Sequence, residues 1–369
     1  MEEVCILGNG AGAHILGALL TSKGVKVNIA DLPQFAAGLK PLQDQGGVEI
    51  VGDAFSGFFK LNMITANMAE ALKGADTVIV MARAQGHMPL IEGALPYLED
   101  GQVVIVYTPF FTTLRIVDMV RKRRLRDLVL GEVQILPFSA NRIRSTTTFL
   151  RNTKSELLAA AMPASDTDRL LERLKEFPHP PTYVRASNVL ETTLSDIMPP
   201  LVVPLPLMNV ILMEWKVSVE YVYGLTRPVG KVVDALDGER IAVGKALGLQ
   251  LESIAQSISK WYSRYGAKGD TSFEVFDNLW THKWEFPPST MHEDIEHGEI
   301  AESVPYFIVP LSYLGRVLGV PTPTTDAIIQ LAQVVAGIEY RRQGLDLEQM
   351  GLARLTRDQI IHYVNTGQK

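Results

Sequence analysis

The stretch from Val4 to Asp31 reads VCILGNGAGAHILGALLTSKGVKVNIAD, and it decides the fold of this chain. A short apolar strand, residues 4–7, leads into the turn GNGAGA, residues 8–13. A helix follows the turn, and a second strand then ends at Asp31. This order of strand, turn, helix and strand is the context in which the pattern G-x-G-x-x-G/A indicates a dinucleotide-binding site.

Each small residue of the turn has a physical role in binding a dinucleotide. Gly8 lets the chain turn sharply, Gly10 leaves no side chain in the path of a pyrophosphate, and Ala13 lets the helix pack close to the strand. Free N–H groups and the positive end of the dipole at the helix start favour phosphate. We therefore predict cofactor contacts at Gly8, Gly10, Ala11, Gly12 and Ala13.

Asp31 indicates which dinucleotide the turn binds. A carboxylate at the end of the second strand accepts hydrogen bonds from the adenosine ribose hydroxyls. It would repel a 2′-phosphate, because two unit charges about 4 Å apart repel by roughly 4 kcal/mol at an effective dielectric of about 20. We therefore predict NAD as the cofactor, with NADP disfavoured. The alternatives are FAD, a site that has lost its ligand, or an ordinary glycine-rich turn of an α/β protein.

The composition is typical of a soluble globular protein with two domains, since 47% of the 369 residues are hydrophobic and 21% are charged. The net charge of −6 gives no general attraction to nucleic acid or to anionic membranes, so we expect neither as a partner. The single cysteine, Cys5, excludes an intramolecular disulfide framework and fits a reducing cytosol. Because the first strand begins so early, we expect no secretory signal and a cytoplasmic location.

One uncharged run, residues 197–213, has to be considered as a membrane span. It is shorter than the roughly 20 residues that a spanning helix needs. It also contains several helix-breaking prolines, namely Pro199, Pro200, Pro204 and Pro206. We expect an extended, proline-rich entry to a buried helix instead.

Strands and helices alternate over the first half of the chain. Short strands are expected near residues 46–52 and 58–65, and the continuous apolar runs at 76–81 and 102–107 are typical of buried parallel strands. A helix at about 88–98 is expected between the last two. This alternation predicts an α/β domain with a Rossmann-type, doubly wound parallel sheet.

A proline-rich run at residues 178–181 marks the expected change of domain. Beyond residue 189, helical periods replace the strand-like alternation, most clearly at 207–225, 228–247, 251–265 and 325–342. We therefore predict a dinucleotide-binding Rossmann domain at 1–182 and a mainly α-helical substrate domain at 183–369.

Two loops follow the buried strands and should lie at the cofactor-binding edge of the sheet. The first, residues 82–87, contains Arg83, whose cation could contact a cofactor phosphate or a substrate carboxylate. It also contains His87, which we predict to contact substrate unless it is an ordinary surface histidine. The second loop begins at Thr108, which we predict to contact the cofactor.

Several segments of the second half follow one another in a characteristic order and spacing. They are YGLTRPV (223–229), LDGERIA (236–242), ALGL (246–249), ESVPYFIVPL (302–311), LG (314–315) and GVPTP (319–323). Together with the glycine-rich turn, they resemble the octopine/nopaline (opine) dehydrogenase family over nearly the whole chain. The resemblance implies a Rossmann domain, a helical substrate domain and a cleft between them. It also implies reduction by NAD(P)H of the imine formed between a 2-oxo acid and an amino acid.

The same resemblance implies a catalytic histidine–aspartate dyad, in which the histidine moves a proton and the aspartate orients its ring. In the family, the histidine stands just before a proline-rich run that matches residues 204–209, and its position falls on Val202. The aspartate belongs to a Glu-Asp-Val-Pro pattern, which here reads Glu302-Ser303-Val304-Pro305. Both dyad positions are therefore substituted, by Val202 and Ser303.

A group of ionisable residues at 281–302 offers an alternative site. One hypothesis is a relocated acid/base pair, either His292 with Asp294 or His297 with Glu302. A second is a metal site, although the spacing matches no established ligand pattern and we predict none. The third is a polar surface loop. This group contains His282, His292, Glu293, Asp294, His297 and Glu299.

Two further residues match the family and are candidates for substrate contact. Asn209 could hydrogen-bond to the substrate or to the nicotinamide ribose, or it could be a helix residue satisfied by the backbone. Arg142 could bind a substrate carboxylate through paired hydrogen bonds, or it could form a structural salt bridge with Glu132.

The leading hypothesis is therefore an NAD-dependent oxidoreductase of the opine-dehydrogenase type, acting on a small 2-oxo acid with or without an amino acid as amine partner. A second is a 2-oxo or hydroxy acid reductase of the ketopantoate-reductase type, with Lys216 or Lys231 as its catalytic lysine. A third is a non-catalytic NAD-binding protein. In each case a homodimer is compatible with a helical domain that exposes apolar faces.

Overall fold

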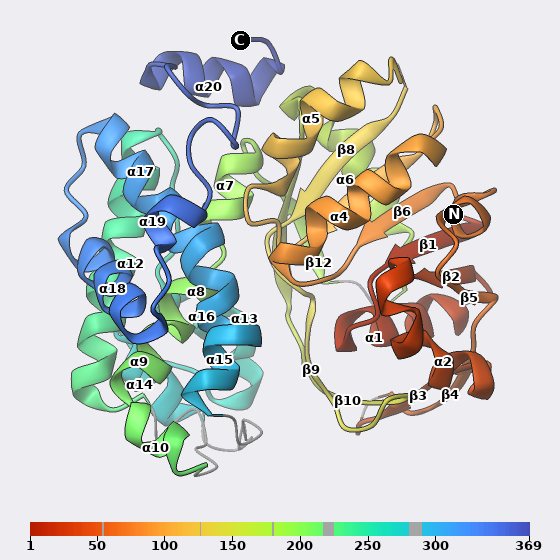
Figure 1. Cartoon of the computed structure of the whole chain (residues 1–369), viewed down its shortest axis with the longest axis horizontal. Coiled ribbons are helices and arrows are strands. Elements are labelled where there is room, and N and C mark those ends of the chain that lie inside the picture. Colours follow the sequence, from red (N-terminus) through yellow and green to blue (C-terminus); the bar gives the residue numbers. More distant parts are fainter. Residues whose placement is uncertain (54, 126, 179–180, 217–224, 280–289) are drawn as a thin grey trace. The chain divides into compact units, whose positions relative to one another are not determined.

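The computed structural model describes residues 1–53, 55–125, 127–178, 181–216, 225–279 and 290–369 (Figure 1). The chain forms two compact units. The first comprises Met1–Thr193 together with His362–Lys369, and the second comprises Leu194–Ile361. The first unit thus extends past residue 182, where a boundary was expected, because the strand Thr182–Arg185 crosses that point and belongs to its sheet.

The main sheet of the first unit has the strand order β12-β11-β8-β7-β6-β1-β2-β5. Every pairing in it is parallel except that between β8 and β11, which is antiparallel. The strands are β1 (Glu3–Leu7), β2 (Lys26–Ala30), β5 (Met63–Thr65), β6 (Thr77–Val80), β7 (Val103–Tyr107), β8 (Val129–Val133), β11 (Glu156–Ala161) and β12 (Thr182–Arg185). The predicted doubly wound sheet is confirmed.

Hydrophobicity explains why the sheet forms where it does. All residues of β6 and β7 are buried, as expected for strands that helices cover on both faces. The helices of this unit are α1 (Ala11–Thr21), α2 (Ala36–Gln45), α3 (Met68–Leu72), α4 (Ala84–Ala94), α5 (Thr112–Lys122), α6 (Thr167–Lys175) and α7 (Val189–Leu194), while α20 (Arg357–Thr366) leads back into the unit near the end of the chain.

The helix expected at about 88–98 begins one turn earlier, at Ala84. Pro89 lies inside α4. As a result, His87 is a helix residue and not a loop residue.

A second, four-stranded sheet has the order β4-β3-β10-β9 and packs against α1. Its strands are β3 (Gly47–Val51), β4 (Gly57–Lys60), β9 (Phe138–Arg142) and β10 (Thr147–Thr153). This small sheet brings the segment near residue 140 next to the helix that carries the glycine-rich turn. The sequence did not predict that proximity.

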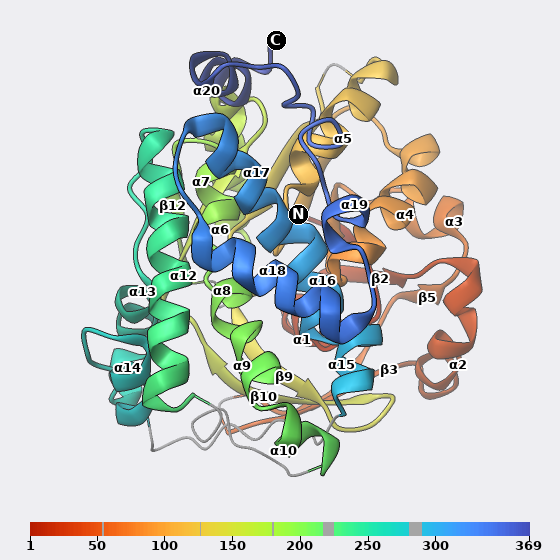
Figure 2. The same cartoon turned by 60° about the vertical axis from the view of Figure 1, so that its left-hand side comes forward.

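The regular elements described in the second unit are helical, which confirms the predicted class of that half of the chain. They are α8 (Met198–Val202), α9 (Pro204–Met208), α10 (Val210–Glu214), α12 (Arg227–Ala246), α13 (Ile254–Tyr262), α14 (Ser272–Asn278), α15 (Met291–His297), α16 (Glu299–Ser303), the π-helical turn η5 (Val304–Ile308), α17 (Val309–Leu318), α18 (Pro323–Ala336) and α19 (Tyr340–Gln343). The long helix α12 packs against α14, α17 and α18 (Figure 2).

Two helices that were expected to be continuous are interrupted. The helix predicted at 207–225 divides at Asn209, whose backbone leaves the helical region, and residues 217–224 lie outside the described part of the chain. The helix predicted at 325–342 ends at Ala336, because Gly337 takes a left-handed conformation with φ of 67°.

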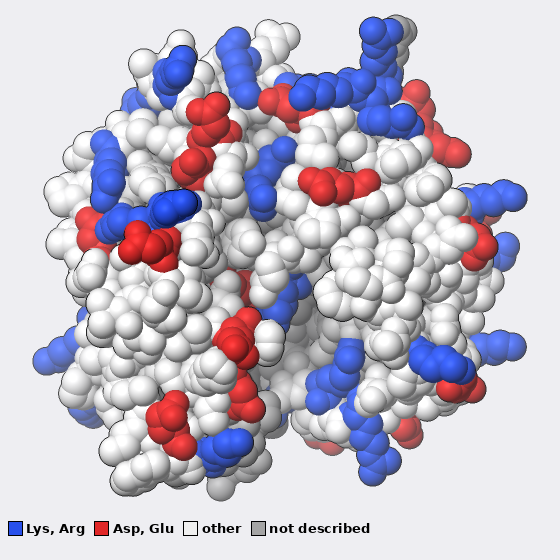
Figure 3. Space-filling view, in the orientation of Figure 1, with Lys and Arg blue, Asp and Glu red and all other residues white. Residues whose placement is uncertain are grey.

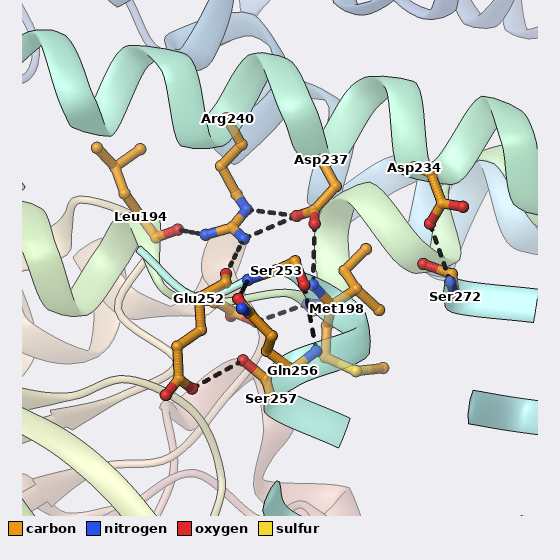
Figure 4. A network of polar contacts seen from close by, with 12 residues as sticks. Leu194, Met198, Asp234, Asp237, Arg240, Glu252, Ser253, Gln256, Ser257 and Ser272 are labelled. Atoms are coloured by element: carbon orange, nitrogen blue, oxygen red, sulfur yellow. Dashed lines mark hydrogen bonds and ion pairs between the residues drawn. The ribbon is translucent and has the colours of Figure 1, made fainter. Parts of the chain in front are cut away.

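A buried ion pair joins α12 to its surroundings (Figure 4). Arg240 is fully buried, and its Nε donates to Asp237 Oδ1 at 2.8 Å. The guanidinium also donates to the carbonyl oxygens of Leu194 and Glu252, each at 2.5 Å. Asp237 Oδ2 accepts from the Ile254 amide at 2.9 Å. Segment 236–242, one of those that carried the family resemblance, thus helps to hold the helical unit together.

Acidic and basic side chains are interspersed over the face of the molecule shown in Figure 3. Among the helices in the described ranges, none is long and apolar enough to cross a membrane.

Candidate dinucleotide-binding site

Gly8, at the end of β1, is required by the fold itself. Its φ is 117°, and a Cβ atom added there would lie 2.4 Å from the backbone oxygen of Met81. Its amide donates to the Ala30 carbonyl at 2.8 Å, which ties the turn to β2. Any side chain at Gly8 would therefore clash with the backbone that follows β6.

Gly10 differs, because nothing in the fold requires a glycine there. It is the N-cap of α1, with φ of −89° and ψ of 176°, an extended conformation that any residue adopts. A Cβ atom added at Gly10 would meet no atom within 4 Å. The N-terminus of α1 has no side-chain cap, so open space lies next to helix N–H groups that need an acceptor.

The remaining small residues of the turn bring α1 close to the sheet. A Cβ at Gly12 would lie 2.9 Å from Met81 Sδ, and Ala13 is fully buried. Ala11 is the first residue of α1 and is half-buried. Gly12 and Ala13 therefore let α1 start close to the sheet, beside the open space at Gly10, and the phosphate contacts predicted for this turn stay predictions.

Asp31 follows β2 and is half-buried. Its Oδ1 accepts from the Leu32 amide at 2.8 Å. Burial raises the pKa of the Asp31 carboxyl, while the Leu32 amide and the Arg142 cation favour its charged form. The predicted contact of this carboxylate with a ribose hydroxyl stays a prediction.

Arg142 approaches this carboxylate from the second sheet. It stands opposite Thr148 in the antiparallel pair of β9 and β10, so the two side chains share the face of the sheet that meets α1. Partial burial lowers the pKa of the Arg142 guanidinium and Asp31 raises it. The expected salt bridge between Arg142 and Glu132 does not form in the described part of the chain. Glu132 is buried and accepts instead from the hydroxyls of Thr192 and Thr193.

His14, which the sequence did not single out, links the glycine-rich turn to the second sheet. Its Nδ1 lies 2.9 Å from Thr148 Oγ1, and its Nε2 lies 2.9 Å from Asn9 Oδ1. Asn9 Nδ2 in turn donates to the Gly38 carbonyl at 3.0 Å. Since Asn9 Oδ1 can only accept, Nε2 carries the proton and Nδ1 accepts from the threonine hydroxyl. The sequence feature that could have identified His14 was a histidine within an otherwise apolar helical run.

Burial lowers the pKa of His14 to about 3, and the Arg142 cation adds to the effect. His14 is therefore neutral at pH 7 and acts as a fixed hydrogen-bonding group. It positions Asn9 between the two glycines of the turn.

The two loops at the carboxyl ends of β6 and β7 lie at the same edge of the sheet as the glycine-rich turn. Arg83 is the exposed N-cap of α4. Thr108, Phe110 and Phe111 have φ values of 53°, 46° and 60°, a conformation that is unfavourable for residues other than glycine. The cofactor contacts predicted for Arg83 and Thr108 stay predictions.

His87 connects these two loops from inside the protein. It is fully buried, with Nδ1 2.8 Å from Thr112 Oγ1 and Nε2 3.0 Å from the Ala82 carbonyl. Burial lowers its pKa to about 4, so it is neutral at pH 7. Both ring nitrogens are engaged within the protein, and the predicted substrate contact stays a prediction.

In the second unit, α15 carries the other candidate catalytic residues. The side chains of His292 and His297 are 78% and 82% exposed, and both lie near Glu296, at 3.1 and 3.7 Å. Asp294 is buried and accepts from the amides of Glu299 and Ile300, which caps α16. His292 and Asp294 stand two residues apart on one helix and so project in different directions. Their catalytic roles stay predictions, and His282 lies outside the described residues.

Asn209 and the two positions that match the family dyad also lie in the second unit. Asn209 is half-buried, and its Nδ2 donates to the Leu205 carbonyl at 2.9 Å. Val202, in α8, is 2% exposed, and Ser303, in α16, is 1% exposed. Because α8 packs against α16 and η5, the two positions that match the family dyad belong to neighbouring elements. Within the described ranges, no three His, Cys, Asp or Glu residues gather in a way that could hold a metal ion.

Comparison with known proteins finds a family match in the helical half and a relative that is similar along nearly the whole chain. Residues 185–336 match the family model described as NAD/NADP octopine/nopaline dehydrogenase, alpha-helical domain. An opine dehydrogenase of Arthrobacter sp. (strain 1C) is 28% identical over 365 residues, which cover 96% of either chain. The resemblance to the octopine/nopaline dehydrogenase family is thereby confirmed.

Solved structures show the same fold. Octopine dehydrogenase with NADH and L-arginine has a TM-score of 0.72 at 18% identity, covering 100% of this chain and 99% of that one. Yersinopine dehydrogenase with NADP⁺ bound has a TM-score of 0.70 at 15% identity, with 99% and 98% covered. A ketopantoate reductase from Ralstonia eutropha JMP134 is more distant, with a TM-score of 0.59 at 16% identity and 91% and 98% covered.

Proposed function

We propose that this chain is an NAD-dependent oxidoreductase of the opine-dehydrogenase type, which joins a small 2-oxo acid to an amino acid. The observation that carries the proposal is the open space at Gly10, beside the uncapped start of α1. The fold does not need a glycine there, whereas a bound pyrophosphate would. Similarity to an opine dehydrogenase along nearly the whole chain supports the reaction class.

The residues of the first unit fit a nicotinamide dinucleotide. The amides at the start of α1 would hold the pyrophosphate, and Asp31 would accept from the adenosine ribose hydroxyls. The cofactor supplies the hydride for the reduction. The carboxylate of Asp31 supports a preference for NAD over NADP.

The substituted dyad positions favour the amine-dependent reaction over reduction of the oxo acid alone. Valine and serine at 202 and 303 offer no group that titrates near neutral pH. When a carbonyl carbon accepts hydride, the carbonyl oxygen needs a proton, whereas the nitrogen of a protonated iminium already carries one. Acid/base work is then concentrated in imine formation, where water must leave. We propose His292 or His297 for that step.

The test is consumption of NADH by the full chain with a panel of 2-oxo acids, each with and without amino acids, followed by mass spectrometry of the product. We expect consumption that requires both substrates and a product in which they are joined through nitrogen. Consumption with an oxo acid alone would favour a reductase of the ketopantoate type. NADH binding without turnover on the whole panel would contradict an enzymatic role.

A further inference from the structure

Arg142 is held near the adenosine end of the dinucleotide site. Its register partner Thr148 bonds to His14 at 2.9 Å, which fixes this part of the second sheet against α1. Side chains opposite one another in an antiparallel pair lie on the same face, so Arg142 points to the same side as Thr148. The mutual electrostatic effects of Arg142 and Asp31 agree with this placement.

The Arg142 guanidinium is not used within the described part of the protein. Its side chain is exposed, and no hydrogen bond or ion pair joins it to a described residue. Asp31 and Arg142 are thus close enough to influence each other, yet they do not close into a salt bridge. The arrangement leaves both groups available to a ligand that lies between them.

The segment that usually supplies a cation to a 2′-phosphate does not do so here. In dinucleotide-binding folds, an arginine near the acidic residue accommodates that phosphate. After Asp31 the chain reads LPQFAAGL, residues 32–39, and Lys40, the next cation, pairs with Asp44. Arg142 therefore supplies, from a remote strand, a charge that the local loop lacks.

We propose that Arg142 is a specificity-determining residue that binds a phosphate on the ribose 2′ oxygen, so that the site accepts NADP as well as NAD. Asp31 favours the free 2′-hydroxyl of NAD, and Arg142 favours the 2′-phosphate of NADP. Together the two residues reduce the difference in affinity between NAD and NADP. This inference rests on the proposed dinucleotide site. It predicts that the Arg142 guanidinium contacts only the 2′-phosphate, so that its loss leaves the affinity for a cofactor without this phosphate unchanged.

The test measures binding to the full chain by calorimetry, with 5′-ADP and 2′,5′-ADP as probes, so that no turnover is needed. We expect Arg142→Gln to weaken 2′,5′-ADP by about tenfold or more, the scale of one charge-assisted hydrogen bond, and to change 5′-ADP less than twofold. Arg142→Lys should recover part of the loss. Arg144→Gln, which removes an exposed cation two residues away, is the matched control and should change neither probe.

Equal weakening of both probes by Arg142→Gln, or no selective effect on 2′,5′-ADP, would overturn the inference. If 5′-ADP still binds in that case, the proposed dinucleotide site stands and only the role of Arg142 fails. Failure of the unaltered chain to bind either probe would overturn both proposals.

Discussion

Two aspartate–arginine pairs in this molecule differ in almost every respect. Asp237 and Arg240 stand one helical turn apart on α12 and are buried, and every bond that they make ends on the protein. Asp31 and Arg142 come from two different sheets, are at least partly exposed, and do not bond to each other. The first pair stabilises the fold, whereas the second leaves its charges available to a ligand.

The difference between the two pairs distinguishes charged residues that stabilise the fold from charged residues that are available to bind a ligand. A buried ion pair survives only if its remaining donors and acceptors are satisfied, because the desolvation cost is otherwise too large. The Asp237–Arg240 pair meets this condition through backbone carbonyls and an amide (Figure 4). An acid and a cation that stay apart at a surface add little stability, which agrees with the binding role that we propose for Asp31 and Arg142.

The largest expected effect comes from breaking the buried pair. Asp237→Ala leaves the Arg240 cation buried without its partner and should lower the free energy of unfolding by about 3–5 kcal/mol. All four tryptophans lie between residues 215 and 284, so tryptophan fluorescence during urea unfolding reports on the second unit. A loss below about 1 kcal/mol would show that the pair is not the structural element that we infer.

His14, beside the glycine-rich turn, should make the stability of the first unit depend on pH. A histidine whose pKa is about 3 when folded and 6.5 when unfolded takes up a proton on unfolding between these values. The free energy of unfolding should therefore fall as the pH drops from about 6.5 toward 3. The contribution of His14 is of the order of a few kcal/mol over the whole window.

In His14→Gln, the free energy of unfolding should fall less steeply between pH 6.5 and 3 than in the unaltered chain, as measured by urea unfolding at several pH values. Glu132 acts in the opposite direction, because burial raises its pKa to about 7 and its charged form is disfavoured in the folded state. Comparison of the two chains at each pH isolates His14. If the free energy of unfolding fell equally steeply with decreasing pH in both chains, the His14 ring would not be held neutral in the fold.

The acid/base role proposed for α15 predicts a kinetic effect without a structural one. His292→Ala or His297→Ala should lower kcat by about a hundredfold, within the usual range for loss of a general acid or base. The Kd of NADH should not change, and neither should the free energy of unfolding beyond about 0.5 kcal/mol, because both side chains are exposed. Unchanged kcat in both variants would place the acid/base group elsewhere.

Arg142→Gln should have only a small effect on stability. Since this side chain makes no bond to a described residue, its loss should alter the free energy of unfolding by less than about 0.5 kcal/mol. Urea unfolding beside Asp237→Ala gives the direct contrast. A loss of 2 kcal/mol or more would mean that Arg142, like Arg240, stabilises the fold.

Local patterns predicted the glycine-rich turn, because each of its requirements lies within one βαβ unit. The buried strands β6 and β7 were equally predictable, since a short, continuous apolar run in this context is typical of a buried parallel strand. The position of Arg142 was not readable, because it depends on the pairing of β9 with β10 and on the packing of both against α1. His14 was missed for the same reason, since its partner Thr148 is remote in sequence.

The catalytic residues were the least predictable part of the candidate site. The family pattern located Val202 and Ser303, and the structure brings their elements together, but neither residue can move a proton near neutral pH. The histidines of α15 were chosen because ionisable residues cluster there and because His297 matches a histidine that often precedes the family's Glu-Asp pattern. Asp294, chosen with them, caps a helix, a role that a cluster of charges in sequence does not reveal.

The most direct test of the central claim is the Kd of NADH, measured by calorimetry for the full chain and for Gly10→Val. The fold leaves space for a side chain at Gly10, so this variant should lose no more than about 1 kcal/mol of stability, the scale of a poorer N-cap residue. Its affinity for NADH should fall by about a hundredfold, or about 2.7 kcal/mol. Gly238→Val, at a helical glycine with equally open surroundings, is the matched control and should keep full affinity. Unchanged affinity in Gly10→Val, or no NADH binding by the unaltered chain, would contradict a dinucleotide site at this turn.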